Sequence, residues 1–323
     1  MKSFKYTEAQ SESVACGLLS ESSLPLAGGT NLLNLMKEYV VQPDALVDIK
    51  NIPGTHSIDE VDGGLRVGAN VTLTELIESR VVASGYPVLH QALVNTATPQ
   101  IRNRGTLGGN LCARPACWYF SHEGFECAKR GDSGCSTKDG ENEFHAIFGT
   151  DSLCVAVHPS SAAPALMALG ATLRVVAPNG PRVVEIDQFF SSEDVRKENV
   201  LAANEIITHV VVGSPNANSA TYEVRQKATH DWPISLASVA LDLKFGVCQS
   251  ARVVLGAVAL SPVRAGGAED RLAGNRITES VAEAAAEAAV QGAKPLSQNA
   301  YKVQATRAAV KRAILIAATG SWK

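Results

Sequence analysis

The chain has 323 residues, of which 46% are apolar and 19% are charged, and its formal net charge is −3. This length suits two or three structural units, and the lack of a basic run or an acidic tail argues against nucleic acid as a partner. The sequence has no apolar stretch long enough for a membrane span and no secretory signal, so we expect a soluble chain without an export address of its own.

The first motif in chain order is LPLAGGTNLLNLMKEY. Apolar residues alternate as in a short strand before Ala27 and recur at helical spacing after Asn31. Gly28 and Gly29 let a ligand approach the backbone closely, and Thr30 and Asn31 add side-chain donors. The pattern is not GxGxxG, so it does not indicate a nicotinamide-binding Rossmann unit. It predicts either a phosphate-binding turn or a plain strand–turn–helix corner.

Strands are predicted at ALVDIKNIPG and LRVGA, and helices at Thr72–Ser79 and Pro87–Thr96. Thr72 and Glu75 have the spacing of a capping box. A second glycine pair then follows in TLGGN, with polar neighbours on both sides: Thr106, Gly108, Gly109 and Asn110. Two such glycine turns suggest two loops that close on one diphosphate from opposite sides, because backbone donors and hydroxyls can neutralise an anion without lysines.

Five of the seven cysteines lie in one segment: Cys112, Cys117, Cys127, Cys135 and Cys154. An odd number of cysteines without a secretory signal favours a metal or iron–sulfur site over a disulfide framework. No CxxC pair is present, which disfavours a zinc ribbon, whereas four thiolates on one long loop can hold a cubane cluster. Spacing alone leaves open whether Cys112 or Cys117 is the first ligand.

Charged residues and histidines accompany these cysteines. Lys129 and Arg130 would offset the negative charge of thiolates and sulfides. His122, His145 and His158 could bind a metal, but each is more often a solvated or core histidine.

The second half of the chain predicts a strand pair across Asn179-Gly180, a strand at EIITHVVV and a polar boundary near Ser214–Ser219. Val239, Leu241, Leu243 and Phe245 alternate with polar or small residues as in a half-buried strand, and ARVVLGAVAL predicts another strand. Helices are predicted at Ser280–Gly292 and Tyr301–Ala318. Strands followed by helices indicate an α+β domain with an antiparallel sheet.

AGGTNL followed by QIRNRGTLGGN resembles the FAD-binding subunits of the molybdenum hydroxylases, the xanthine dehydrogenase family. The resemblance covers nearly the whole chain and includes HPSSAAPALMALGA and the closing YKVQATRAAVKRAIL. It implies an α+β fold: a PCMH-type, vanillyl-alcohol-oxidase-like FAD-binding domain of two α/β subdomains, then a C-terminal domain like that of CO dehydrogenase flavoproteins. We place the first at residues 1–216, with a cysteine-rich insertion at 112–154, and the second at 217–323.

The insertion resembles that of the periplasmic aldehyde oxidoreductase FAD subunits, which carry a [4Fe–4S] cluster. By that resemblance the cluster ligands are Cys117, Cys127, Cys135 and Cys154. The resemblance also implies a set of FAD contacts: Leu26, Ala27, Gly28, Gly29, Thr30, Asn31, Leu32, Leu33, Thr106, Gly108, Gly109, Asn110, Ser161 and Lys227. The chain departs from the family at Ser161, where an aspartate is frequent, and at Cys112, which relatives with the insertion usually lack.

The resemblance further implies a heterotrimer. A large subunit with the molybdenum cofactor would oxidise an aldehyde to a carboxylic acid, and a small [2Fe–2S] subunit would pass electrons to FAD on this chain. An external acceptor other than NAD is expected, since the sequence lacks an NAD fingerprint.

Three other functions stay open at this point: the FAD subunit of a 4-hydroxybenzoyl-CoA reductase-type enzyme, a zinc-bearing interaction module without flavin, and an independent flavin oxidase. The last is disfavoured because the sequence shows no evident substrate base. The complex would be periplasmic, by co-export with a partner bearing a twin-arginine signal, or cytoplasmic.

Overall fold

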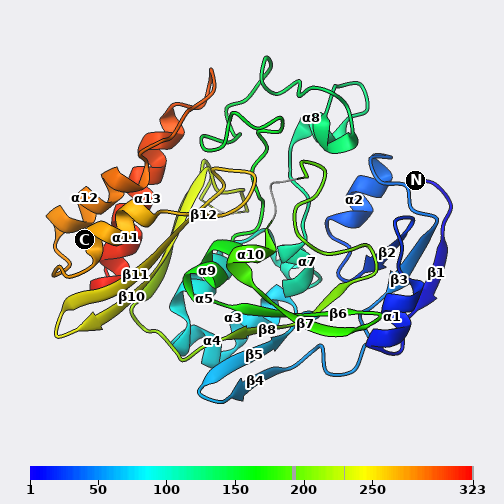
Figure 1. The fold of residues 1–323 in the computed structure, drawn as a ribbon, viewed down its shortest axis with the longest axis horizontal. Coiled ribbons are helices and arrows are strands. Elements are labelled where there is room, and N and C mark those ends of the chain that lie inside the picture. Colours follow the sequence, from blue (N-terminus) through cyan, green and yellow to red (C-terminus); the bar gives the residue numbers. More distant parts are fainter. Residues whose placement is uncertain (191–193, 229, 322–323) are drawn as a thin grey trace.

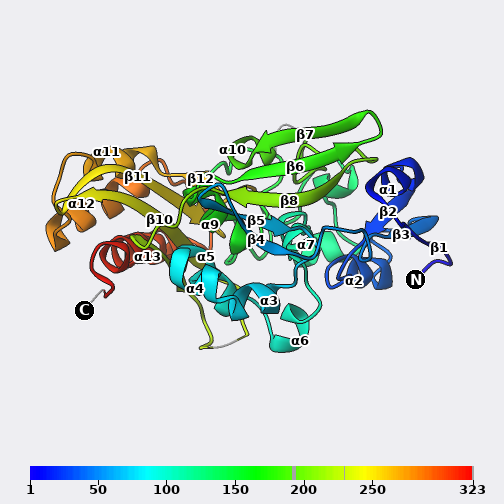
Figure 2. The same cartoon turned by 90° about the horizontal axis from the view of Figure 1, so that it is seen from below.

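The computed structural model describes residues 1–190, 194–228 and 230–321. Their strands form three sheets, each with its own helices (Figure 1). Seen from below, the amino-terminal sheet and the carboxy-terminal sheet lie at opposite ends of the molecule (Figure 2). Within the described residues, no helix combines the length and apolar character needed to cross a bilayer.

The first sheet is small, parallel and ordered β1–β3–β2, from strands Lys5–Glu8, Ala45–Asp48 and Ser23–Leu26. Helix α1 (Glu12–Leu18) follows β1, and helix α2 (Leu32–Lys37) begins just after the first glycine motif. The strand, turn and helix predicted around that motif are therefore confirmed.

The second sheet has five antiparallel strands in the order β4–β5–β8–β6–β7. In that order the strands are Ile58–Val61, Gly64–Gly68, Ile206–Val212, Thr172–Ala177 and Gly180–Glu185. The predicted hairpin is β6–β7, and Gly180 adopts a φ of +121° at its turn. Strand β8 comes late in the chain but lies between β5 and β6.

Helices of the second unit bury a continuous apolar core against this sheet. They are α3 (Leu73–Glu78), α4 (Arg80–Gly85), α5 (Pro87–Val94), α7 (Leu107–Leu111), α9 (Ala162–Ala168) and α10 (Ile186–Phe189), whereas the short helix α6 (Pro99–Arg102) has no buried residue. The predicted capping box starts α3: Glu75 N–H donates to Thr72 Oγ1 at 3.2 Å, and Thr72 N–H donates to Glu75 Oε2 at 2.7 Å.

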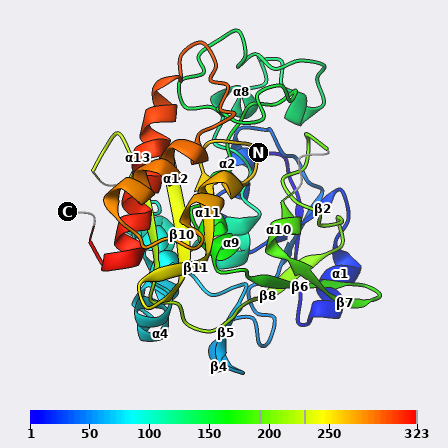
Figure 3. The ribbon, with the colours of Figure 1, turned by 60° about the vertical axis from the view of Figure 1, so that its left-hand side comes forward.

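The third sheet is antiparallel and ordered β12–β11–β10–β9. Its strands are Val263–Arg264, Val247–Gly256, Ser235–Lys244 and Ser219–Val224. Helices α11 (Gly266–Leu272), α12 (Glu279–Ala289) and α13 (Tyr301–Thr319) cover one face (Figure 3), and α5 and α9 contact the same strands.

Two-sided packing corrects one prediction about β10. Its first seven residues, Ser235–Leu241, are all buried, so the strand is not half-buried. Phe245 is not in the strand; it lies in the following turn, with a φ of +53° and 87% exposure.

The cysteine segment is mostly irregular, with α8 (Trp118–Ser121) and the 3₁₀ turn η1 (Ala128–Arg130) as its regular elements. It lies at the top of Figure 1, between α2 and the start of α13. Asn142, whose main chain and side chain bond to Ser297 and Gln298, fixes the segment to the loop before α13.

Candidate functional site

The first glycine motif is a half-buried turn between β2 and α2. Gly29 has a φ of +74°, and the main-chain N–H groups of residues 28–31 have no hydrogen-bond partner among the described residues. Leu26 ends β2, and Leu32 and Leu33 begin α2, all three half-buried. A run of unpaired N–H groups in a turn forms a concave site that suits an anion such as a diphosphate.

The second glycine motif is not a turn, which corrects the prediction of two glycine loops. Gly108 and Gly109 lie in helix α7, where Thr106 is the N-cap and accepts a hydrogen bond from Gly109 N–H at 3.1 Å. The Gly108 N–H is taken by the carbonyl of Ala69 at 2.8 Å. Both N–H groups are therefore bonded within the protein and are not available to a ligand. The motif leaves the exposed surface of Gly109 and the side chain of Asn110 for a ligand.

The two motifs nevertheless lie against each other. A Cβ atom at Gly28 would stand 1.9 Å from the main-chain oxygen of Arg104, and one at Gly105 would stand 3.7 Å from Thr30 Oγ1. Gly28 thus permits backbone-to-backbone contact between the segments that carry the two motifs.

Ser160 and Ser161 join this region from the start of α9. Ser160 Oγ donates to Asn110 Oδ1 and accepts from Ala163 N–H at 2.9 Å. Ser161 is buried beside Glu223 of β9 and lowers the pKa of that carboxyl. The structure therefore connects Ser161 with the second motif through its neighbour Ser160.

Glu223 is a buried carboxylate that no sequence pattern indicated as a site residue. Its side chain is 2% exposed, and neither oxygen has a hydrogen-bond partner among the described residues. Burial raises its pKa to about 7, although Ser161 and Arg225 act in the opposite direction. Arg225 Nε lies 3.8 Å from Glu223 Oε2, which is ion-pair distance but too long for a hydrogen bond. A buried carboxylate without hydrogen bonds is costly, so this position favours a ligand that donates one.

Lys227 lies elsewhere. It is exposed in the loop after β9, and that loop is held by Arg225, whose Nη1 donates to the carbonyl of Asn95 at 3.1 Å. Among the described residues, no hydrogen bond or ion pair joins Lys227 to either glycine motif.

Four cysteines of the insertion come together in the fold. Cys117, Cys127 and Cys154 are buried in one apolar cluster with Leu35 of α2. The main chain of Cys135, which is half-buried, pairs with that of Cys127 in an isolated antiparallel bridge. Both Cys135 and Cys117 raise the pKa of Cys154 electrostatically, so these thiols are neighbours.

Cys112 is separate from this group. It follows α7 and packs against the core of the second sheet, where burial raises its pKa to about 12. All seven cysteines are free thiols, so the insertion is not a disulfide cage.

The geometry discriminates between kinds of metal site. Within the described part of the chain, no three His, Cys, Asp or Glu side chains converge on a point where a single ion would bind. Zinc needs such convergence. A cubane cluster differs, because each of its four irons takes one cysteine and the sulfurs stay apart. The four neighbouring free cysteines supply the number and type of ligand that a cubane cluster takes.

Main-chain and charged groups surround the sulfurs. The N–H groups of Phe120 and Tyr119 lower the pKa of Cys117, but burial raises it more. Burial raises the pKa of Cys154 to about 11, although Lys129 lowers it. Both thiols are therefore protonated at neutral pH unless a ligand binds the thiolate form.

The two predicted basic residues have different roles. Lys129 is fully buried, and its Nζ donates to Glu198 Oε1 at 2.8 Å and to the carbonyl of Val195 at 2.9 Å. Arg130 donates to the carbonyls of Tyr119 and Phe120, so it folds the loop.

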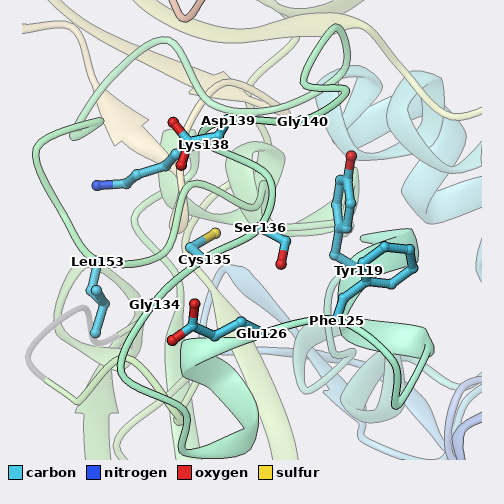
Figure 4. Close-up of a pocket in the computed structure, with 10 residues that line it drawn as sticks. All are labelled: Tyr119, Phe125, Glu126, Gly134, Cys135, Ser136, Lys138, Asp139, Gly140 and Leu153. Carbon is cyan, nitrogen blue, oxygen red and sulfur yellow. The ribbon is translucent and has the colours of Figure 1, made fainter.

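An open hollow of about 620 Å³ adjoins the cysteines. Cys135 lines it, with Glu126 on one side and Lys138 and Asp139 on the other (Figure 4). Cys135 is thus the cysteine of the group nearest to solvent, while the other three are buried.

Sequence reasoning missed residues that join the two sites. Asn31 of the glycine motif exchanges two hydrogen bonds with the main chain of Arg114, at 3.1 and 3.3 Å. Arg114 in turn pairs with Glu198, the partner of Lys129. The long sequence separation of these residues leaves no local signal.

The three histidines differ in environment. His145 is buried with Nε2 3.3 Å from Cys117 Sγ, and burial lowers its pKa to about 4. His122 is exposed. His158 is buried and accepts a hydrogen bond from Ser160 N–H through Nδ1, as expected for a core histidine.

This two-domain fold, with its turn of unpaired N–H groups, is that of a class of flavoproteins. Residues 2–215 match the FAD binding domain in molybdopterin dehydrogenase, and residues 220–317 match the CO dehydrogenase flavoprotein C-terminal domain. The chain belongs to this family and is an FAD subunit of an oxidoreductase.

Individual relatives agree with this assignment. The chain is 34% identical to the aldehyde oxidoreductase FAD-binding subunit PaoB of Escherichia coli (strain K12), over 94% of each chain. It is 30% identical to the nicotine 6-hydroxylase medium subunit of Paenarthrobacter nicotinovorans, over 92% of this chain and 88% of that one. A solved structure of quinoline 2-oxidoreductase from Pseudomonas putida 86 superposes with a TM-score of 0.78 and 27% identity, over 99% of both chains.

Proposed function

We propose that this chain is the FAD and [4Fe–4S] electron-transfer subunit of a heterotrimeric molybdenum-dependent aldehyde oxidoreductase. A large molybdenum subunit would convert an aldehyde and water to a carboxylic acid, two protons and two electrons. A small [2Fe–2S] subunit would pass these electrons to this chain. Similarity over nearly the full length to an aldehyde oxidoreductase FAD-binding subunit supports the proposal. In this proposal residues 1–216 form the FAD-binding domain and residues 217–323 form the C-terminal domain.

The residues that would hold FAD lie around the two motifs. The free N–H groups of residues 28–31 suit the diphosphate, and Leu26, Leu32 and Leu33 flank them. Asn110 offers a half-buried polar side chain, and Ser161 and Glu223 are buried beside each other. FAD supplies the change from one-electron to two-electron transfer, and the chain sets its position. The external acceptor is proposed to be a molecule other than NAD.

The cluster assignment rests on four free cysteines that lie together beside α2. Cys117, Cys127, Cys135 and Cys154 would each bind one iron, whereas Cys112 packs in a different core.

Two measurements on the purified complex test the proposal. Its absorption spectrum should show flavin bands over a broad iron–sulfur background, and a colourless protein would refute it. Turnover of aromatic aldehydes should exceed turnover of aroyl-CoA esters. The reverse preference would assign the chain to a 4-hydroxybenzoyl-CoA reductase-type enzyme.

The compartment follows from the partner subunits in this proposal. A twin-arginine signal on a partner would place the assembled complex in the periplasm by co-export. Without such a signal, the complex would be cytoplasmic. The amino-terminal sequence of the large and small subunits therefore decides between the two.

A further inference from the structure

His145 and Cys117 form a contact that the FAD and cluster assignments do not explain. His145 Nε2 lies 3.3 Å from Cys117 Sγ, and both side chains are buried. The other ring nitrogen, Nδ1, is buried without a hydrogen-bond partner among the described residues. The imidazole is therefore directed at the sulfur and at no other polar side chain of this part of the structure.

The tautomer of this histidine follows from the chemistry of a metal-bound cysteine. A thiolate ligand has no proton to donate, so a hydrogen bond to it requires the proton on the imidazole. Nε2 must then carry the N–H, and Nδ1 is the unprotonated nitrogen. The unprotonated Nδ1 is then an acceptor, and no donor reaches it among the described residues.

The ring is held rigidly in this orientation. It packs edge-to-face on Trp118, with ring centroids 5.3 Å apart and planes at 87°. Its main-chain carbonyl accepts hydrogen bonds from Asn299 Nδ2 at 3.1 Å and from Lys302 Nζ at 2.9 Å. Residues of the carboxy-terminal domain thus fix the backbone from which the imidazole reaches Cys117.

We infer that His145 is a positioning residue that donates its Nε2–H to the sulfur of Cys117 and thereby favours the reduced form of the [4Fe–4S] cluster. The inference rests on the proposed function, because it requires Cys117 to be a cluster ligand. The reduced cluster carries one more negative charge than the oxidised cluster, and a donor to a ligand sulfur stabilises that charge. Hydrogen bonds to the sulfurs are among the factors that set such reduction potentials.

The test is a dithionite titration of the purified complex, followed by electron paramagnetic resonance of the reduced cluster. In His145→Phe the ring remains but the donor is lost. We expect a roughly tenfold lower ratio of reduced to oxidised cluster at a fixed potential, which is about 59 mV toward negative values for a one-electron couple. His145→Gln, whose amide reaches a position similar to Nε2, should recover much of the shift. His122→Gln is the exposed control from the same segment and should leave the potential unchanged.

An unchanged potential in His145→Phe, or an equal shift in the glutamine variant, would overturn the inference. If the phenylalanine variant loses its iron, the test is pulsed electron paramagnetic resonance on the unsubstituted complex labelled with ¹⁵N-histidine. A weak coupling to one histidine nitrogen is expected, whereas no coupling, or the strong coupling of a direct ligand, would contradict it. An unsubstituted complex without this cluster would refute the proposed function itself.

Discussion

Lys302 Nζ, near the start of α13, donates a hydrogen bond to the main-chain carbonyl of His145 at 2.9 Å. The same ammonium bonds to the carbonyls of Phe144 and Ala257, at 2.9 and 2.8 Å. One buried lysine therefore joins the cysteine segment, the third sheet and the last helix. This relationship makes the C-terminal domain part of the cysteine site.

Lys302→Met should destabilise the protein by about 3 kcal/mol, because it leaves the carbonyls of Phe144 and Ala257 without their donor and the His145 carbonyl with Asn299 alone. The control is Lys311→Met on the same helix. Lys311 forms partly exposed ion pairs with Glu279 and Glu283, so its loss should cost less than about 1 kcal/mol. Denaturant unfolding of the two variants provides the comparison, and equal losses would show that Lys302 has no special structural role.

Gly28→Ala should damage the fold, whereas Gly109→Ala should spare it. The new Cβ of the first would meet the Arg104 carbonyl at 1.9 Å, and such overpacking costs about 1–3 kcal/mol. The Cβ of the second would meet only Thr106 Oγ1, at 2.9 Å, and alanine favours the helix.

Gly109 is exposed in the segment that packs against the turn at residues 28–31, so we expect Gly109→Ala to weaken flavin retention at nearly normal melting temperature. Melting curves and flavin content per chain measure the two effects separately. Full flavin content in Gly109→Ala would show that α7 does not contribute to flavin binding.

Glu223→Gln should change the pH dependence of stability. Burial raises the pKa of Glu223 from 4.5 to about 7, so the folded protein binds more protons than the unfolded chain between these values. Its contribution to the free energy of unfolding therefore falls as pH rises from 4.5 to 7, by at most about 3 kcal/mol. The glutamine variant lacks this loss and should gain stability relative to the unsubstituted protein at pH 8, but not at pH 4.5. An equal difference in stability between the two proteins at pH 4.5 and at pH 8 would show that Glu223 does not titrate between these values.

Cys112→Ser and Cys117→Ser should separate the two candidates for the first cluster ligand. Cys117 shares the buried cluster of Cys127 and Cys154, and Cys112 does not. Iron should therefore be retained in the first variant and lost in the second. If iron is retained in Cys117→Ser and lost in Cys112→Ser, Cys112 is the first cluster ligand instead.

Much of the fold could be predicted from sequence because its signals are local. The turn between β2 and α2, the capping box at Thr72, the β6–β7 hairpin and α13 all follow from residues close together in the chain. The helical state of Gly108 and Gly109 was missed, since a glycine pair indicates a turn until Thr106 is seen to cap a helix. The roles of Glu223, Lys302 and Arg114 depend on partners more than 60 residues away, which local patterns do not contain.

The most direct test is flavin and iron analysis of the purified complex beside its Cys127→Ser variant. We predict one FAD per chain in both proteins and about four fewer irons per protomer in the variant, because four-cysteine ligation leaves no substitute ligand. Equal iron in the two complexes, or an unsubstituted complex without flavin, would contradict the account.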